Sequence, residues 1–237
     1  MTAACSPAIW MRWARLLFLH WPMPIADAAK LLPPGLEIDI FDGTAWIGLV
    51  PFRMETTHVR GFPRPFERMT GMSAFFECNV RTYVRAGDCR GVWFCSLDAE
   101  RLLPVLGGRW LWGLNYIHSR FDVEIEGDRV RYELCRLRGE GRTHIDWEAG
   151  KSLPLSEPGS LEHFLTERYL LFVHRRGRLL AGRIEHERWP LRRVRLHALD
   201  DTLVPSAGVL ASVRGEPHAL ASDGVDTCAY PLEPVTP

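Results

Sequence analysis

Apolar and polar residues alternate along much of the chain with a period of two, which is the pattern of half-buried β-strands. In the segment 36–40, Leu36, Ile38 and Ile40 alternate with the acidic residues Glu37 and Asp39. The same pattern, with runs rich in β-branched and aromatic residues, predicts further strands at 44–54, 75–84, 91–96, 121–126, 129–137, 142–148, 169–174, 179–186, 194–199 and 225–232.

Short helical segments interrupt these strands at three places. One is expected at 25–32 and a second from Asp98 towards Trp112, and a third follows Ser160, a residue type favoured at helix N-caps. Short strands joined mostly by turns, with few helices, predict a mainly β (α+β) and largely antiparallel protein, with a sheet of βαβ units as the alternative. No linker or repeat divides the sequence, so we expect a single domain over residues 1–237.

Composition narrows the classes of function without naming a reaction. Of 237 residues, 46% are hydrophobic and 24% charged, and 29 basic residues balance 29 acidic ones, so no nucleic-acid partner is expected. No apolar stretch reaches 18 residues, and Arg12 and Arg15 interrupt the apolar N-terminal segment; we therefore expect a cytoplasmic protein without a membrane partner. The six cysteines form no Cys-x-x-Cys pair, and neither a metal nor another cofactor is expected.

The segment 75–84 carries the most informative polar residues. Successive side chains of a strand point to opposite faces, so Phe76, Cys78, Val80, Thr82 and Val84 would share one face. The other face would present an acid, an amide, a guanidinium and a phenol in one line: Glu77, Asn79, Arg81 and Tyr83. This second face either meets solvent or, in a curved sheet, lines a pocket.

If the second face lines a pocket, its residues suit a small organic acid. Arg81 would hold a carboxylate through paired hydrogen bonds. Glu77 would act as an acid or base if burial raised its pKa. His20 and His186 have no partners at metal-ligand spacing, and we expect both to be structural. No Gly-x-Ser-x-Gly elbow or phosphate-binding glycine motif is present.

Several motifs together resemble a known family over about residues 13–232. They are 31–37 (LLPPGLE), 42–52 (DGTAWIGLVPF), 77–84 (ECNVRTYV), 96–98 (SLD), 165–169 (LTERY) and 186–191 (HERWPL). They are similar to the YqjF-like family of uncharacterised conserved bacterial proteins, which is grouped with the acetoacetate decarboxylase-like superfamily. The resemblance implies antiparallel strands in a closed, cone-like barrel around a small-molecule pocket, with Glu77 as the counterpart of a glutamate in the decarboxylase.

One departure from the superfamily pattern bears on mechanism. The decarboxylase forms a Schiff base with a lysine from a lysine pair that follows a Gly-Arg-x-Leu motif. Here that motif is 108–111 (GRWL), and the pair is replaced by Tyr116 and Ile117. Only Lys30 and Lys151 remain elsewhere in the chain, so imine chemistry is not expected. The resemblance suggests Tyr116 as a donor to a ligand carbonyl and Arg109 as an anion partner.

These observations leave three hypotheses open. The protein is an enzyme acting on a small organic or keto acid (a lyase, hydratase or isomerase), a non-catalytic binding module, or an interaction scaffold. In the first, Glu77 and Tyr116 are the catalytic candidates. The substrate-binding candidates are Arg81, Asn79, Tyr83 and Arg109. Nine tryptophans offer apolar surface for burial, and a homodimer through an edge strand is one assembly this suggests.

Overall fold

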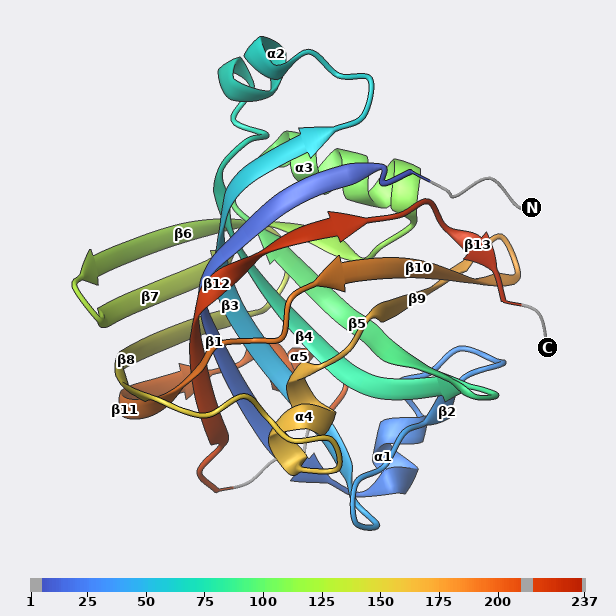
Figure 1. The fold of residues 1–237 in the computed structure, drawn as a ribbon, viewed down its shortest axis with the longest axis vertical. Coiled ribbons are helices and arrows are strands. Elements are labelled where there is room, and N and C mark those ends of the chain that lie inside the picture. The colour runs from blue at the N-terminus through green and yellow to red at the C-terminus, as the bar shows by residue number, and fades with distance from the viewer. Residues whose placement is uncertain (1–5, 210–214, 236–237) are drawn as a thin grey trace.

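The computed structural model describes residues 6–209 and 215–235, which form one extensively paired, mostly antiparallel sheet with short helices at its ends (Figure 1). The strands are β1 (Ile9–Met23), β2 (Glu37–Ile38), β3 (Ala45–Val59), β4 (Phe75–Ala86), β5 (Cys89–Ala99), β6 (Tyr116–Glu126), β7 (Arg129–Arg136), β8 (Arg142–Ser152), β9 (Leu170–Arg175), β10 (Arg178–His186), β11 (Leu191–Asp201), β12 (His218–Ala229) and β13 (Glu233–Pro234). The predicted mainly β, antiparallel class is confirmed. Parallel pairing occurs at two short contacts among the described strands, β5 with β6 and β5 with β9.

The strand pairings close into two rings that share five strands. The shared strands lie in the order β12-β1-β3-β4-β5. The first ring is completed by β6, β7, β8 and β11, and the second by β9 and β10. Each shared strand therefore has one face towards each ring, which gives its alternating side chains two different environments.

The first ring encloses an apolar core, and the second encloses a cavity. On β4, Cys78 and Val80 pack into the core with residues such as Leu19, Ile47 and Trp147. The alternate residues of β4 line the cavity instead. Thus the predicted separation of β4 into an apolar and a polar face corresponds to the two rings.

The long first strand, β1, was not predicted because its alternation reverses in mid-strand. Met11 and Trp13 line the cavity before Arg15, whereas Leu16 lines it afterwards. Arg15 has a positive φ of 53°, and the pairing with β3 shifts register around it. A bulge of this kind inserts a residue and exchanges the two faces, so the sequence shows no continuous period of two.

The helices number six in the described residues, rather than about three. They are α1 (Ile25–Ala29), α2 (Arg64–Met69), α3 (Leu102–Gly107), the π-helix η1 (Gly108–Trp112), α4 (Leu161–Thr166) and α5 (Leu203–Ser206). The N-cap prediction for α4 is confirmed, since the Ser160 hydroxyl accepts a hydrogen bond from the His163 amide. Asp98 does not begin a helix: it lies in β5, fully buried and paired with Arg136. None of the described helices has the length and apolarity to cross a membrane.

Candidate functional site

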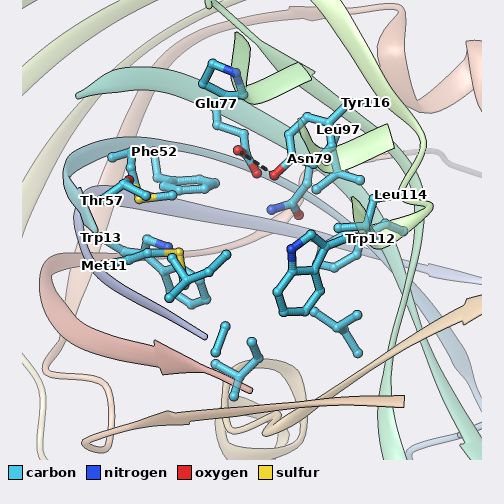
Figure 2. A pocket seen from close by; sticks show the side chains of 18 of the residues that line it. Met11, Trp13, Phe52, Thr57, Glu77, Asn79, Leu97, Trp112, Leu114 and Tyr116 are labelled. Carbon is cyan, nitrogen blue, oxygen red and sulfur yellow. Dashed lines mark hydrogen bonds between the residues drawn. The ribbon is translucent and has the colours of Figure 1, made fainter. Parts of the chain in front are cut away.

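The second ring surrounds a cavity of about 240 Å³ whose wall is mainly apolar (Figure 2). Strands β1, β3, β4, β5, β9 and β10 form its sides, while α3 and η1 lie at its mouth. Its apolar lining includes Met11, Trp13, Val50, Phe52, Met54, Val92, Phe94, Leu97, Trp112, Leu114, Ile184 and Trp189. Because polar groups are few here, each of them is a candidate for fixing the orientation of a ligand.

Glu77 projects from β4 into this cavity and is 3% exposed. The Tyr116 hydroxyl donates a hydrogen bond to Glu77 Oε2 over 3.1 Å, as Figure 2 shows. Burial raises the pKa of Glu77 to about 8, and the negative charge of Asp98 adds to the increase, while the Tyr116 hydrogen bond opposes it. The carboxyl group is therefore largely protonated at pH 7 and ready to exchange a proton near that pH.

Tyr116 owes its position to a glycine on η1. A Cβ atom on Gly108 would lie 2.3 Å from the Tyr116 ring, so only glycine leaves room for the phenol there. The neighbouring Arg109 lies on the solvent side, and its Nε donates to the Tyr116 backbone oxygen over 2.6 Å. Arg109 supports the backbone of Tyr116 but does not line the cavity, contrary to the role suggested for it as an anion partner.

Asn79 lies next along the same face of β4 and is 5% exposed. Figure 2 shows its amide pointing into the cavity beside Tyr116. Its Oδ1 atom finds no hydrogen-bond partner in the described part of the chain. Buried amides are normally satisfied, so this atom is a candidate contact for a ligand.

Arg81 brings a positive charge to the cavity and forms no ion pair with any described residue. Its Nη2 donates to the Leu165 carbonyl over 3.2 Å, and its guanidinium lies near the rings of Phe18 and Tyr83. Arg168 also lines the cavity but is neutralised by Asp39 at 2.6 Å. Arg81 is thus the cation available to an anionic ligand.

Tyr83 does not line the cavity, which corrects the expectation that it would bind substrate. It is fully buried, and its hydroxyl donates to the Leu165 carbonyl over 2.7 Å while lying 2.6 Å from His20 Nε2. Burial lowers the pKa of His20 well below its usual value, so the ring is neutral. This network fixes α4 at the end of the cavity where Arg81 lies.

Comparison with known proteins identifies the family of this chain. The model of the DUF2071 family, described as an uncharacterized conserved protein, matches residues 10–226. The chain belongs to the DUF2071 family. The uncharacterized protein YqjF of Bacillus subtilis (strain 168) is 33% identical to this chain over 198 residues, which cover 83% of this chain and 80% of that protein.

Solved structures confirm the acetoacetate decarboxylase-like fold of this DUF2071 chain. An acetoacetate decarboxylase-like enzyme from Sphingomonas wittichii RW1 is 13% identical, with a TM-score of 0.69 over 98% of this chain and 94% of that one. The enduracididine biosynthesis enzyme MppR complexed with pyruvate is 16% identical, with a TM-score of 0.67 over 99% and 93%. Acetoacetate decarboxylase from Legionella pneumophila is 13% identical, with a TM-score of 0.63 over 100% and 92%.

Sequence analysis missed His186 as a cavity residue in this DUF2071 chain. The side chain lines the cavity and packs against the rings of Trp13, Tyr169 and Trp189. Its Nδ1 lies 2.7 Å from the Glu187 carbonyl, and burial lowers its pKa, so the imidazole is neutral at pH 7. The available signal was its place two residues after Ile184 in the predicted strand 179–186, since side chains two apart on a strand share a face.

Neither lysine lies near the cavity. Lys30 caps α1 and pairs with Asp27, and Lys151 is an exposed residue near the end of β8. Among the described residues there is also no cluster of three or more His, Cys, Asp or Glu side chains that could hold a metal ion. The polar groups available for chemistry in the cavity are therefore those of Glu77, Asn79, Arg81, Tyr116 and His186.

Proposed function

We propose that this protein is an enzyme that binds a small organic acid bearing a carbonyl group and moves a proton through Glu77, without forming an imine. The observation that carries the proposal is the buried Glu77 carboxyl, whose pKa lies at about 8, hydrogen-bonded to Tyr116 in an apolar cavity. Pairs of groups whose pKa values are moved in opposite directions are typical of acid–base sites. Here burial raises the pKa of Glu77 and lowers that of His186.

The proposed step is proton abstraction from a carbon next to the carbonyl. The Glu77 carboxylate takes the proton, the C–H electron pair forms an enolate, and the negative charge moves to the carbonyl oxygen. The Tyr116 hydroxyl and the Asn79 amide lie beside Glu77 and would donate hydrogen bonds to that oxygen. Return of a proton to the enolate completes an isomerisation or exchange, and loss of a leaving group instead gives a lyase or dehydration reaction.

Arg81 accounts for the acidic character of the proposed ligand. A guanidinium that lines an apolar cavity without a carboxylate partner is a favourable site for a carboxylate, because the low local polarity strengthens their attraction. Imine formation finds no support, since neither Lys30 nor Lys151 lines the cavity.

Hydrogen–deuterium exchange tests the proposal. Oxo acids would be incubated with the protein in D₂O, and loss of the signals of protons next to the carbonyl would be followed by NMR. The exchange rate should rise about tenfold per pH unit up to the Glu77 pKa near 8, because the base must be deprotonated. Glu77→Gln should lower the rate by about 10²–10⁴-fold, whereas the exposed Glu126→Gln should leave it unchanged.

Tyr116→Phe gives a second readout. It removes a hydrogen bond that lowers the pKa of Glu77, so the pH profile should shift to higher pH as the rate falls. Exchange that persists in Glu77→Gln, or a lysine adduct trapped by borohydride, would refute the mechanism.

A non-catalytic binding module is the second candidate. One observation favours it: Glu77 is the single carboxylate among the described residues that line the cavity. On this alternative, oxo acids would raise the melting temperature without any exchange of their protons.

A further inference from the structure

We infer that the ligand of this cavity is an amphipathic oxo acid, with its carboxylate and carbonyl together at one end and an uncharged alkyl or aryl group, much larger than a methyl group, extending towards the mouth. This inference rests on the function proposed above and adds the class of substrate. It excludes acids as small as pyruvate, and dicarboxylates, as the preferred ligands.

The polar groups that would bind the acid lie on one wall of the cavity. Glu77 and Arg81 flank Asn79 on the same face of β4, and residues two apart on a strand lie about 6–7 Å from each other. The strand register places Asn79 opposite Leu97 of β5, and Leu97 beside Tyr116 of β6. Figure 2 shows the side chains of Glu77, Asn79 and Tyr116 grouped together. The polar end of a ligand therefore belongs at this wall.

The other walls offer no second charge to a ligand. Among the described residues that line the cavity, Arg168 is paired with Asp39, and the Thr166 hydroxyl donates to a backbone carbonyl of α4. Thr57 is uncharged, and His186 is neutral at pH 7. A second charged group on the ligand would be desolvated there without a partner, which is unfavourable.

Apolar side chains form most of the remaining lining. They come from β1, β3, β5 and β10 and include Met11, Trp13, Val50, Phe52, Met54, Val92, Phe94 and Ile184. Transfer of an apolar group from water to such surroundings strengthens binding by roughly fourfold for each CH₂ group. These walls therefore suit the apolar part of an amphipathic acid.

The size of the cavity leads to the same conclusion. Its volume is about 240 Å³, whereas one bound water molecule needs only about 10–15 Å³. At roughly that volume for each non-hydrogen atom, pyruvate would fill less than about half of the space. The ligand that fills it must carry a larger group next to the carbonyl.

The mouth of the cavity shows where that group would extend. Phe62, Leu103 and Leu111 line the cavity and are nevertheless 45%, 41% and 66% exposed. Leu111 lies on η1, the same short helix whose Gly108 packs against the Tyr116 ring. Exposed apolar side chains gathered at one place mark binding surfaces. An alkyl or aryl group that begins at the polar wall and extends to the mouth would cover them.

A homologous series of 2-oxo acids tests the inference on the wild-type protein. Dissociation constants of pyruvate, 2-oxobutanoate, 2-oxohexanoate and 2-oxo-octanoate would be measured by calorimetry, and their exchange rates in D₂O by NMR. We expect 2-oxohexanoate, with three more CH₂ groups than pyruvate, to bind about 60-fold more tightly. The heat-capacity change of binding should become more negative along the series, since this is the signature of apolar burial.

2-Oxoadipate is the matched control for charge, because it differs from 2-oxohexanoate in carrying a carboxylate in place of the terminal methyl group. It should bind at least tenfold more weakly than 2-oxohexanoate, since the second carboxylate would lose its water without gaining a partner.

Leu111→Ser tests the direction of the apolar group. It should lower the affinity for 2-oxo-octanoate several-fold more than that for pyruvate, because only the longer acid reaches the mouth. Leu155→Ser, at a leucine that is 53% exposed but does not line the cavity, is the matched control and should leave the ratio of the two affinities unchanged. An unchanged ratio in Leu111→Ser would overturn the placement of the apolar group at the mouth.

The remaining outcomes separate the two proposals. Equal affinity along the series, or tighter binding of pyruvate or 2-oxoadipate than of 2-oxohexanoate, would overturn this inference whether or not exchange occurs. Exchange of pyruvate protons in that case would still uphold the catalytic function. Affinity that rises with chain length without any exchange would uphold the inference and refute the catalytic function.

Discussion

The protonated state of Glu77 predicts that the protein loses stability as pH rises. A carboxyl group whose pKa is higher in the folded than in the unfolded chain binds its proton more tightly when folded. Its contribution is fully present below the usual pKa of 4.5 and is lost as pH rises through the folded value of about 8. Each pH unit in this window changes the free energy of unfolding by about 1.4 kcal/mol. Integration over the titration gives a loss of about 4 kcal/mol between pH 5 and 9.

The assay compares wild type with Glu77→Gln by urea denaturation at several pH values from 5 to 9. Glutamine resembles the protonated carboxyl and does not titrate, so the variant should lack this component of the pH dependence. The difference in unfolding free energy between the two proteins should therefore change by about 4 kcal/mol across the range. Glu126→Gln, on the exposed side of β6, should retain the wild-type profile.

Parallel pH profiles for wild type and Glu77→Gln would refute this reasoning. They would mean that the carboxyl has the same pKa in the folded and unfolded chains. The desolvation argument for Glu77 as an acid–base group would then fail together with the stability prediction.

Two further predictions concern the groups around the cavity. Gly108→Ala should displace the Tyr116 ring and remove its hydrogen bond to the carboxyl, so that proton exchange falls and its pH profile moves upward; Gly107→Ala, where a Cβ meets nothing within 4 Å, should leave exchange unchanged. Equal effects of the two alanines on exchange would contradict this account. Arg136→Met should lower the free energy of unfolding by about 3–5 kcal/mol in urea denaturation, because it leaves the buried Asp98 carboxylate without its partner. A loss below about 1 kcal/mol, typical of an exposed pair, would show that the pair is not desolvated.

Local alternation in the sequence predicted many of the strands and the two faces of β4, although not the long first strand β1. The pattern around Glu77, Asn79 and Arg81 depends only on the geometry of an extended chain, which turns successive side chains to opposite sides. The structure confirms that these three residues share a face. It also places them in the same cavity as Tyr116, although that residue lies on another strand.

Bulges limited the same reasoning elsewhere. The positive φ of Arg15 exchanges the faces of β1, so Met11 and Trp13 were not recognised as cavity residues. A bulge depends on the pairing with neighbouring strands, and a period of two in one segment carries no information about it. Alternation also placed Tyr83 with the polar face. It could not show that the Tyr83 hydroxyl donates to the Leu165 carbonyl of α4, because that contact joins segments far apart in the sequence.

By itself, the sequence determined that the protein is mainly β, that β4 has one apolar and one polar face, and that the chain has only two lysines. These are properties of residue identity and of neighbours along the chain. Only the tertiary structure decided that the polar face encloses a cavity, that Arg109 and Tyr83 lie outside it and that His186 lies inside. It also decided the pKa of Glu77, because desolvation and the charge of Asp98 arise from strands that meet only when the two rings close.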